Sequence, residues 1–381
     1  MTRIWLLRHA EAEGNLYRRI HGCTDSGLTE MGIRQLKPLG ERFLSVPLDA
    51  VYASDLRRSQ QTAAALAEPK GLRLRILPGL REVNMGAWED QCWGYVARFE
   101  PEQYRALNKD PARFTVPGCE PYEVSVRRIL GAIRQIAAEN PGGEAAAVAH
   151  GCIIRILLAN LLGVPSENIW SVPHGDNTCV AELEAEEDGV IRLLRYNDNS
   201  HLPAELSAFA REDWWKKEET TDGRDLYYLP MDVDSVDGGR TYLRRYRETW
   251  IASHGTDLGF SDIYLTKARA SAQADPMTVL EVYAGETPCG MLELSPHKGA
   301  GEGAGHITLL FLEREFRDLG LGVQLLGQAI SYYRKLGRKF LRLHVSDTNI
   351  KAIKFYESWG FHRADSEPDS FGETYVMEKP I

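Results

Sequence analysis

The chain has 381 residues, of which 43% are hydrophobic and 26% are charged, and its formal net charge is −9. This length is more typical of two ordinary domains than of one. The composition excludes a disordered or fibrous chain, and the acidic balance argues against a nucleic-acid partner, which would need a basic surface.

Six cysteines are scattered along the chain without any C-x-x-C pair. This distribution argues against a metal site or a disulfide framework and favours free thiols in a reducing compartment. The longest apolar stretch, Cys152–Val164, is too short to span a bilayer and contains Arg155. No signal peptide is recognisable, because the N-terminus enters a strand-like run at once. We therefore expect a soluble, cytoplasmic protein without a membrane partner.

The first half of the chain alternates strand-like and helix-like segments. Helical periodicity appears at Thr29–Leu44, Arg57–Leu66, Glu120–Ala138 and Cys152–Leu162. This order predicts an α/β domain whose sheet has helices on both faces. The segment Trp88–Thr115 is rich in aromatic residues and arginine without a clear period, and we expect an insertion lying over the sheet. The strand-like runs are Arg3–Leu7, Leu48–Ala53, Leu72–Leu77, Ala145–Ala149, Cys179–Glu184 and Val190–Tyr196.

The second half has a different order of elements, which predicts an α+β domain. Between Ala208 and Asp225 the sequence becomes charged and weakly periodic, so we expect a first domain at 1–212, a linker at 213–224 and a second domain at 225–381. Helices are predicted at Arg240–Ser253, Gly320–Leu336 and Thr348–Trp359. Strands are predicted at Tyr227–Met231, Met277–Ala284, Gly290–Ser295, His306–Phe311 and Phe340–Val345, with a final hairpin within Phe361–Lys379.

Charged or titratable residues follow four strand-like runs of the first half. Arg8 and His9 follow the first run, Arg58 and Glu82 come shortly after the second and third, and His150 follows the fourth. Ligands of open α/β sheets bind outside the carboxyl ends of the strands, so these side chains can share one pocket. Guanidinium groups match phosphate oxygens, and a neutral histidine can act as a nucleophile. The pattern predicts a pocket for a phosphate monoester, in which Glu82 is the candidate acid that protonates the leaving group.

These residues lie in four blocks that resemble the histidine phosphatase superfamily, with its phosphoglycerate-mutase-like fold, over about 200 residues. The blocks are Leu7-Arg8-His9-Ala10-Glu11 with Asn15, Ser54-Asp55-Leu56-Arg57-Arg58-Ser59-Gln60-Gln61-Thr62-Ala63, Leu80-Arg81-Glu82-Val83 and Ala149-His150-Gly151.

The resemblance implies a three-layer domain with a largely parallel sheet and a metal-independent reaction. By this resemblance His9 would be phosphorylated transiently, and Glu82 would be the acid and base. In the second block we assign the arginine that precedes Ser59, and we expect its neighbour Arg57 to be solvated. The phosphoryl group would be held by Arg8, Arg58 and His150, with Asn15 and Gly151 bordering the site.

The length of the insertion bears on the identity of the phosphoryl acceptor. Mutases that resemble this fold carry longer insertions that enclose a bisphosphate, whereas here 67 residues separate Glu82 from His150. A more open pocket favours water as the acceptor, and hence a phosphatase. Phosphoglycerate mutase remains the alternative.

A glycine-containing loop in the second half is placed to bind a pyrophosphate. The run His306–Phe311 leads into Arg317-Asp318-Leu319-Gly320-Leu321-Gly322, which opens a helix. Glycines let backbone amides turn toward one anion, and the helix N-terminus adds its dipole. Taken alone, this R-x-x-G-x-G motif fits a helix-capping loop equally well.

A second block, following the next strand, supports the pyrophosphate interpretation. Asn349, Ala352, Phe355-Tyr356 and Gly360-Phe361 form N-x-x-A-x-x-F-Y-x-x-x-G-F. Together the two blocks resemble the GNAT acetyltransferase superfamily over about 155 residues. The resemblance implies a mixed sheet, acetyl-CoA as cofactor and an amine acceptor. The pyrophosphate would be held by Arg317 and the amides of Leu319, Gly320, Leu321 and Gly322, while Asn349 would touch the pantetheine arm and Tyr356 would protonate the leaving thiolate.

Acetyl transfer also requires the acceptor amine to lose a proton. A lysine-like amine has a pKa of about 10.4, so it is almost entirely charged near pH 7. His306 lies at a position that resembles the one supplying a base in some GNAT members, and His254 and Glu293 are weaker candidates.

The sequence therefore indicates a bifunctional fusion of a phosphatase with an N-acetyltransferase. One alternative is a phosphatase whose CoA-binding domain only senses acetyl-CoA, and the other is a phosphoglycerate mutase with an appended acetyltransferase. Sensing requires the pyrophosphate loop but no acid, so the presence of Tyr356 favours catalysis.

Overall fold

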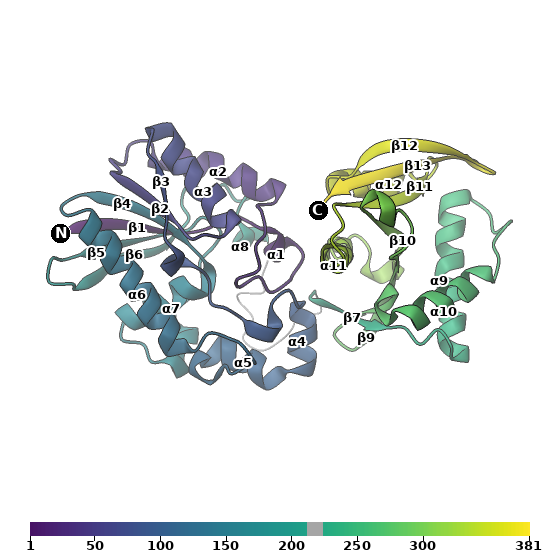
Figure 1. Cartoon of the computed structure of the whole chain (residues 1–381), viewed down its shortest axis with the longest axis horizontal. Helices are drawn as coiled ribbons and strands as arrows, with labels where there is room; N and C mark the ends of the chain where they lie inside the picture. The colour runs from purple at the N-terminus through teal and green to yellow at the C-terminus, as the bar shows by residue number, and fades with distance from the viewer. Residues whose placement is uncertain (212–223) are drawn as a thin grey trace. The chain divides into compact units, whose positions relative to one another are not determined.

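The computed structural model describes residues 1–211 and 224–381. Its contacts divide the chain into two compact units, Met1–Asp222 and Gly223–Ile381 (Figure 1). The linker expected at 213–224 lies outside the described residues, apart from Arg224. The fold classes predicted for the two halves, α/β and then α+β with a mixed sheet, are confirmed.

The first unit is built on a six-stranded, largely parallel sheet with the order β3-β2-β4-β1-β5-β6. The central strand β4 is buried along almost its whole length, as expected for a parallel strand covered on both faces. The parallel strands are β1 (Thr2–Arg8), β2 (Ala50–Ala53), β3 (Leu74–Ile76) and β4 (Glu144–Ala149), and the antiparallel strands are β5 (Val180–Ala185) and β6 (Ile191–Asp198).

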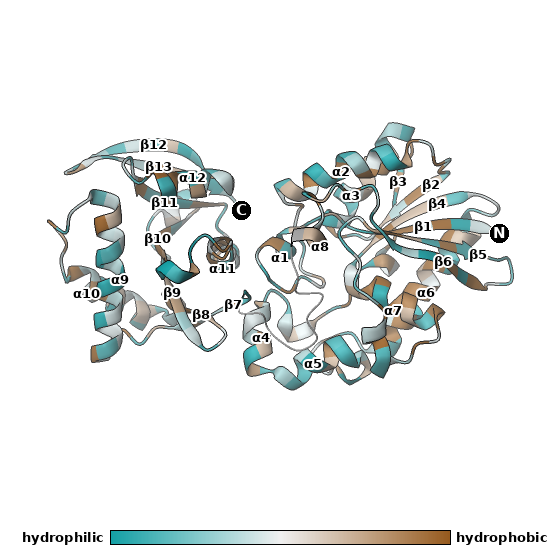
Figure 2. Cartoon of the chain, turned by 180° about the vertical axis from the view of Figure 1, so that it is seen from behind, coloured by the Kyte–Doolittle hydropathy of each residue, from teal (hydrophilic) through white to brown (hydrophobic). Residues whose placement is uncertain are grey.

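Helices cover both faces of this sheet. Successive strand residues point to opposite faces, so β4 contributes to two cores. Val148 packs in one core with residues of α2 (Glu30–Phe43) and α3 (Arg57–Ala67). Ala147 packs in the other with residues of α6 (Tyr122–Glu139) and α7 (Gly151–Leu161), whose hydrophobic residues are brown in Figure 2. This arrangement is the predicted three-layer architecture.

The insertion differs from the prediction. It contains two helices, α4 (Trp93–Phe99) and α5 (Pro101–Lys109), where no periodicity was recognised. The first has only seven residues and the second buries no residue completely, so neither produces a sustained apolar pattern. The insertion contacts α6 and the 3-10 segment Ser166–Ser171, and its Trp88, Val96 and Phe114 pack in the same buried core as Leu6 and Ala147 of the sheet. Two further short helices are α1 (Glu13–Leu16) and α8 (Ala208–Arg211).

The second unit has a seven-stranded mixed sheet with the order β12-β13-β11-β10-β9-β8-β7. Its one parallel pair, β10 with β11, is joined only from Ala304 to His306 and from Phe340 to Arg342, so the two strands separate beyond that point. A register shift between Ile307 and Leu309 also interrupts the pairing of β10 with β9. The strands are β7 (Leu226–Pro230), β8 (Val279–Ala284), β9 (Thr287–Ser295), β10 (Ala304–Leu312), β11 (Phe340–Ser346), β12 (His362–Asp369) and β13 (Gly372–Pro380).

Helices lie on both sides of the second sheet (Figure 1). α9 (Val236–His254) and α10 (Ile263–Ala274) pack on the face that carries Leu309. α11 (Gly322–Lys335) packs on the other face, and α12 (Ile350–Ser358) follows β11. The sequence did not predict α10, because that helix buries only Leu265 and Ala268. No helix in the described part of the chain is long and apolar enough to cross a membrane.

Candidate active sites

The four parallel strands of the first unit bring the predicted phosphate-site residues to one edge of the sheet. His9 directly follows β1, and His150 directly follows β4. Arg58 is in the first turn of α3, after β2, and Glu82 comes after β3 and the 3-10 segment Pro78–Leu80. The imidazole rings of His9 and His150 have centroids 5.0 Å apart. The two histidines, although separated widely in sequence, therefore share one site.

The His9 ring is held in an orientation that suits a nucleophile. Its Nδ1 lies 2.7 Å from the carbonyl oxygen of Ala10. Because a carbonyl only accepts, Nδ1 carries the proton and Nε2 has a free lone pair. Burial, together with the positive charges of Arg58 and Arg8, lowers the pKa of His9 well below its usual value of 6.5. The ring is therefore neutral near pH 7.

Arg58 and His150 are hydrogen-bonded to each other. Arg58 Nε donates to His150 Nδ1 at 3.2 Å, and the other ring nitrogen of His150 lies 2.7 Å from Ser54 Oγ. Burial and the charge of Arg58 lower the pKa of His150 well below 6.5. The Nη atoms of Arg58 donate to three backbone carbonyls between residues 21 and 24, which fix the guanidinium. Arg57 is exposed, as expected.

Glu82 is held by backbone amides. Its Oε1 accepts from the amides of Val83 and Ile153 at 2.9 and 2.8 Å, and its Oε2 accepts from Cys152 at 2.9 Å. The amides of Cys152 and Ile153 belong to the first turn of α7, where N–H groups have no partner within the helix. A carboxylate oxygen has two lone pairs, so Oε2 retains one that could carry a proton.

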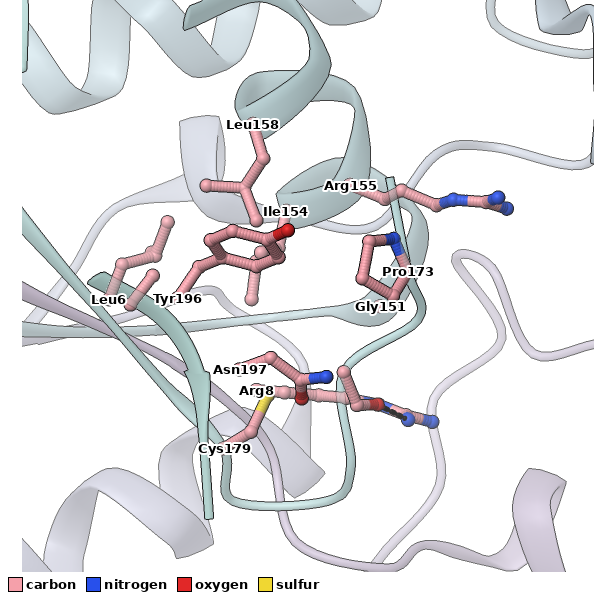
Figure 3. Close-up of a pocket in the computed structure, with 12 residues that line it drawn as sticks. Leu6, Arg8, Gly151, Ile154, Arg155, Leu158, Pro173, Cys179, Tyr196 and Asn197 are labelled. Atoms are coloured by element: carbon pink, nitrogen blue, oxygen red, sulfur yellow. Dashed lines mark hydrogen bonds between the residues drawn. The ribbon is translucent and has the colours of Figure 1, made fainter. Parts of the chain in front are cut away.

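Arg8 lies beside the start of α7, in the pocket of Figure 3. Its Nη1 donates to the carbonyl of Gly175 at 2.5 Å. Its buried Nε has no hydrogen-bond partner in the described part of the chain, and a Cβ added at Gly151 would lie 3.4 Å from it. An anion at this position would satisfy that donor. Asn15 is half-buried in α1 and accepts from the amide of Ala12 at 3.1 Å, so its place at the pocket edge remains a prediction.

The structure adds a residue that the sequence analysis missed. Arg128 of α6 donates to the carbonyls of Gly79, Arg81 and Glu82 at 2.9, 2.7 and 3.3 Å. The same guanidinium forms two hydrogen bonds, of 2.8 and 2.6 Å, with the carboxylate of Glu120. Arg128 thus fixes the segment that carries Glu82. No local motif marks it, because it lies within an ordinary helix.

In the second unit, the loop before α11 has the backbone of an anion-binding turn. Asp318 and Gly320 have φ values of 62° and 76°, and Leu321 is in the right-handed helical region. Such an alternation turns successive amides toward one side. Leu319 is exposed at the tip of the loop. Arg317 donates to the carbonyl of Leu312 at 2.6 Å and to Glu248 at 2.9 Å, and so ties the loop to β10 and α9.

The start of α11 lies beside α12, which carries Asn349 and Tyr356. A Cβ added at Gly322 would lie 3.0 Å from the ring of Phe355. Asn349 caps α12 by accepting from the amide of Ala352 at 3.2 Å. Burial raises the pKa of Tyr356 to about 12, so its hydroxyl keeps its proton near pH 7. The two sequence blocks therefore lie beside each other.

The candidate bases differ in their surroundings. His306 Nε2 lies 2.9 Å from His344 Nδ1, and burial together with nearby positive groups lowers the pKa of His306 to about 3. A ring this weakly basic is a poor proton acceptor near pH 7, although its role remains a prediction. The ring of His254 packs against those of Trp250 and Phe371, with centroid distances of 4.3 and 4.8 Å.

Comparisons with known proteins match both units. Residues 4–199 match the model of the histidine phosphatase superfamily (branch 1), and residues 241–361 match the model of the acetyltransferase (GNAT) family. A probable phosphoglycerate mutase GpmB of Yersinia pestis (strain Pestoides F) is 33% identical over 166 residues, which are 44% of this chain and 77% of that protein.

Among solved structures, Bacillus stearothermophilus YhfR is 28% identical and has a TM-score of 0.51. The match covers 53% of this chain and 99% of that one. The chain belongs to the histidine phosphatase superfamily through its first unit, and its second unit makes it a fusion with a domain of the GNAT acetyltransferase family.

Proposed function

We propose that the first unit hydrolyses a small-molecule phosphate monoester through a phosphohistidine formed at His9. The orientation of the His9 ring carries this proposal. Its Nδ1 bonds to the carbonyl of Ala10, which leaves Nε2 available, and the ring is neutral next to two cationic side chains. A neutral nitrogen among fixed positive charges can attack a phosphorus atom whose oxygens those charges attract.

The reaction would take place in two steps. In the first, Nε2 of His9 forms a bond to phosphorus while the ester P–O bond breaks, and the departing oxygen takes a proton from Glu82. In the second, Glu82 takes a proton from a water molecule whose oxygen bonds to phosphorus, and the N–P bond breaks. The products are an alcohol and inorganic phosphate, and both residues return to their starting states. Glu82 Oε2, which accepts a single amide, is the oxygen that would carry the proton.

Arg8, Arg58 and His150 would hold the phosphoryl oxygens, and Gly151 would border the site. Because backbone carbonyls already fix Arg58, little reorganisation would accompany transfer. No metal ion is needed in this scheme. Within residues 1–211 and 224–381, no three His, Cys, Asp or Glu side chains converge to hold one.

The test is to trap the phosphoenzyme of the full-length chain. After brief reaction with a phosphate ester, we expect an acid-labile phosphoryl group on the peptide that contains His9, detected by mass spectrometry. The His9→Ala variant should lack this group and the phosphatase activity while retaining acetyl transfer. A phosphoryl group on any other residue would contradict the mechanism, and loss of both activities would contradict independent sites.

The comparison with a probable phosphoglycerate mutase favours a second candidate function, a mutase. The same phosphohistidine would then pass its phosphoryl group to a second phosphorylated compound instead of to water. Supplying 3-phosphoglycerate together with a phosphate ester distinguishes the two functions. Release of inorganic phosphate supports the phosphatase, whereas phosphoryl transfer to the added compound, without release, supports the mutase.

For the second unit we propose acetyl-CoA-dependent N-acetylation of an amine. The residues fit this cofactor, because the loop before α11 turns its amides toward one side for a pyrophosphate and the separation of β10 from β11 leaves strand-edge groups for a pantetheine arm. Leu319, Gly320, Leu321 and Gly322 would supply the amides, Arg317 would hold the loop, and Asn349 would lie along the arm. Acetyl-CoA would supply an acetyl group activated as a thioester. As the amine nitrogen bonds to the acetyl carbon and the C–S bond breaks, Tyr356 would give its hydroxyl proton to the leaving sulfur. The proton that the nitrogen loses as the amide forms would restore this hydroxyl.

Replacing Tyr356 with Phe separates catalysis from sensing. If the unit is an enzyme, acetyl transfer should fall by about 10²-fold or more while CoA still binds, because a general acid commonly contributes 10²–10⁴-fold. Tyr332→Phe is a control, since that hydroxyl bonds to Asp275 at the other end of α11. Unchanged acetylation by the Tyr356 variant would remove its proposed role, and CoA binding without any acetylation by the wild type would favour a sensor.

We further propose the domain limits 1–212 and 225–381, joined by a linker at 213–224. All six cysteines are free thiols, which supports a location in the reducing cytoplasm. Separate assays of the two activities in the full-length chain, with each site inactivated in turn, would show whether they depend on each other.

A further inference from the structure

Glu293 is a buried carboxylate without a cation partner. It lies on β9 and is 6% exposed. Its one hydrogen bond within the described part of the chain comes from the hydroxyl of Tyr242 on α9, which donates to Oε2 at 2.8 Å. Burial raises the pKa of Glu293 to about 7. A protein seldom buries such a group without a partner, so this carboxylate requires an explanation.

The position of Glu293 connects it with the proposed acetyltransferase site. It is paired with Leu309 of β10, at the register shift that follows Ile307. The pairing of β10 with β11 has ended by then, at His306 and Arg342. Glu293 is therefore one strand away from the place where β10 and β11 separate, on the face covered by α9 and α10.

Aromatic rings lead from Glu293 along α9. We use the term ring stripe for Tyr242, Tyr246, Trp250 and His254, which repeat every four residues and so share one side of the helix. Tyr264 of α10 stacks on Tyr246 with a centroid distance of 4.4 Å. The outer end of the stripe reaches Phe371, which is 37% exposed.

We propose that Glu293 takes the proton from the acceptor amine, and that the acceptor is a small primary amine with an aromatic or other apolar body that lies along the ring stripe. Ring faces attract ammonium groups as well as apolar bodies, and the carboxylate supplies the missing counter-charge at the inner end. This proposal rests on the acetyltransferase function proposed above and names its substrate class.

The proton transfer balances within the site. The N–H bond of the ammonium group breaks, an O–H bond forms on Glu293, and the amine becomes neutral. Tyr242, by donating to Oε2, would keep the carboxylate turned toward the amine. Glu293 would return its proton to solvent after each turnover.

The titratable neighbours on the packed elements are few. Tyr242 and Tyr246 come from α9, and Tyr264 comes from α10. Burial raises the pKa of all three, so they remain neutral near pH 7. Arg245 of α9 is bound to Glu281 and Glu313, and His306 of β10 lies opposite Ser295, two residues along β9. Glu293 is therefore the group in this environment that titrates near neutrality.

Calorimetric titration of the full-length protein with 2-phenylethylamine, without acetyl-CoA, tests the site directly. At pH 7 a carboxyl with a pKa of about 7 is half protonated, so binding of the ammonium ion should release about half a proton. Comparing buffers of different ionisation enthalpy measures this release. Glu293→Gln should abolish it, and Glu286→Gln, an exposed change in the β8–β9 turn, should not. Ethylamine should bind at least about tenfold more weakly than 2-phenylethylamine.

The pH profile of acetylation provides a second readout. Removing the Tyr242 hydroxyl removes a hydrogen bond that stabilises the charged form of Glu293, so Tyr242→Phe should shift the acid limb to higher pH. Tyr283→Phe is the matched control, because its hydroxyl bonds to a different carboxylate, Glu281. Glu293→Gln should lower kcat/KM by about 10²–10⁴-fold and remove the limb.

The outcomes are distinct. Equal binding of both amines, or no binding of 2-phenylethylamine, would overturn the apolar acceptor. The role of Glu293 would be overturned if the Glu293→Gln variant still released protons on binding the amine. It would also be overturned if Tyr242→Phe did not shift the acid limb of the pH profile. Proton-coupled amine binding without acetylation would support the site and refute only the proposed acetyltransferase activity.

Discussion

Arg128 provides a stringent test of the proposed phosphatase mechanism, because it holds the backbone of the segment that carries Glu82, the proposed acid. Its guanidinium holds the carbonyls of Gly79, Arg81 and Glu82 and is itself held by Glu120. Replacing it with Met keeps the aliphatic stem and removes every one of these bonds. The segment that carries Glu82 would then be free to shift relative to His9.

The structure sets the magnitude of two effects. The Arg128–Glu120 pair is largely buried, with side chains 22% and 13% exposed, and breaking such a pair costs about 3–5 kcal/mol. A domain is commonly stable by about 5–15 kcal/mol, so the variant should remain folded at 25 °C. A displacement of about 1 Å at an acid costs roughly 10²-fold in rate. We therefore expect the loss to fall on the proton transfer to the leaving group.

Two substrates separate this effect from a general loss of structure. With an alkyl phosphate, whose alkoxide must be protonated as it leaves, kcat/KM should fall by about 10²–10³-fold. With dinitrophenyl phosphate, whose leaving group departs without a proton, the loss should stay below about tenfold. Arg127→Met, an exposed change one residue away, is the matched control. An equal loss with both substrates, or none with either, would refute a positioning role for Arg128.

Three further results are expected. The pKa of His9 lies well below 6.5, so phosphatase activity, corrected for ionisation of the substrate, should stay constant from pH 7 to about pH 6. A pH profile in which activity falls with a midpoint at 6.5 or above would contradict a neutral, buried nucleophile. Chelators should leave phosphatase activity unchanged, and strong inhibition would refute a metal-free mechanism. Gly320→Glu should block CoA binding by placing a negative charge at the loop proposed to bind the pyrophosphate. Gly320→Ala, which has the same backbone strain at a φ of 76°, should retain most of the CoA binding. Unchanged CoA binding by the Glu variant would show that the pyrophosphate binds elsewhere.

The elements that the sequence predicted well are those whose burial is uniform or periodic. The apolar run of β4 and the amphipathic helix α6 could be recognised because each side chain meets a similar environment at regular intervals. α10 and α5 could not, because each buries too few side chains to produce such a pattern. Pattern reasoning detects a buried face and has little signal where a helix lies mostly in solvent.

The candidate sites show a similar division. The grouping of His9, Arg58, Glu82 and His150 at one edge of the sheet could be predicted, since each comes after a parallel strand and the ends of such strands lie side by side. Their hydrogen-bond partners do not follow from the sequence. The Ala10 carbonyl that orients His9, for example, becomes a partner only when the ring adopts one rotamer. Glu293 could be named from the sequence as a weak candidate for the base. That it has no cation partner becomes apparent only when α9 and α10 are placed over β9.

The first turn of α7 explains why the phosphate site depends on tertiary structure. His150 precedes it and contacts Arg58, Gly151 lies against Arg8, and the next two amides hold Glu82. Four side chains, each of which ends or follows a different strand, are therefore aligned by the first turn of one helix. The helix N-terminus also carries partial positive charge, which suits both a phosphate and a carboxylate. A change that moved this turn would misplace Glu82, the proposed acid, together with the arginines proposed to bind phosphate. Substitutions in the core beneath α7 should therefore lower activity even though they lie far from the reacting atoms.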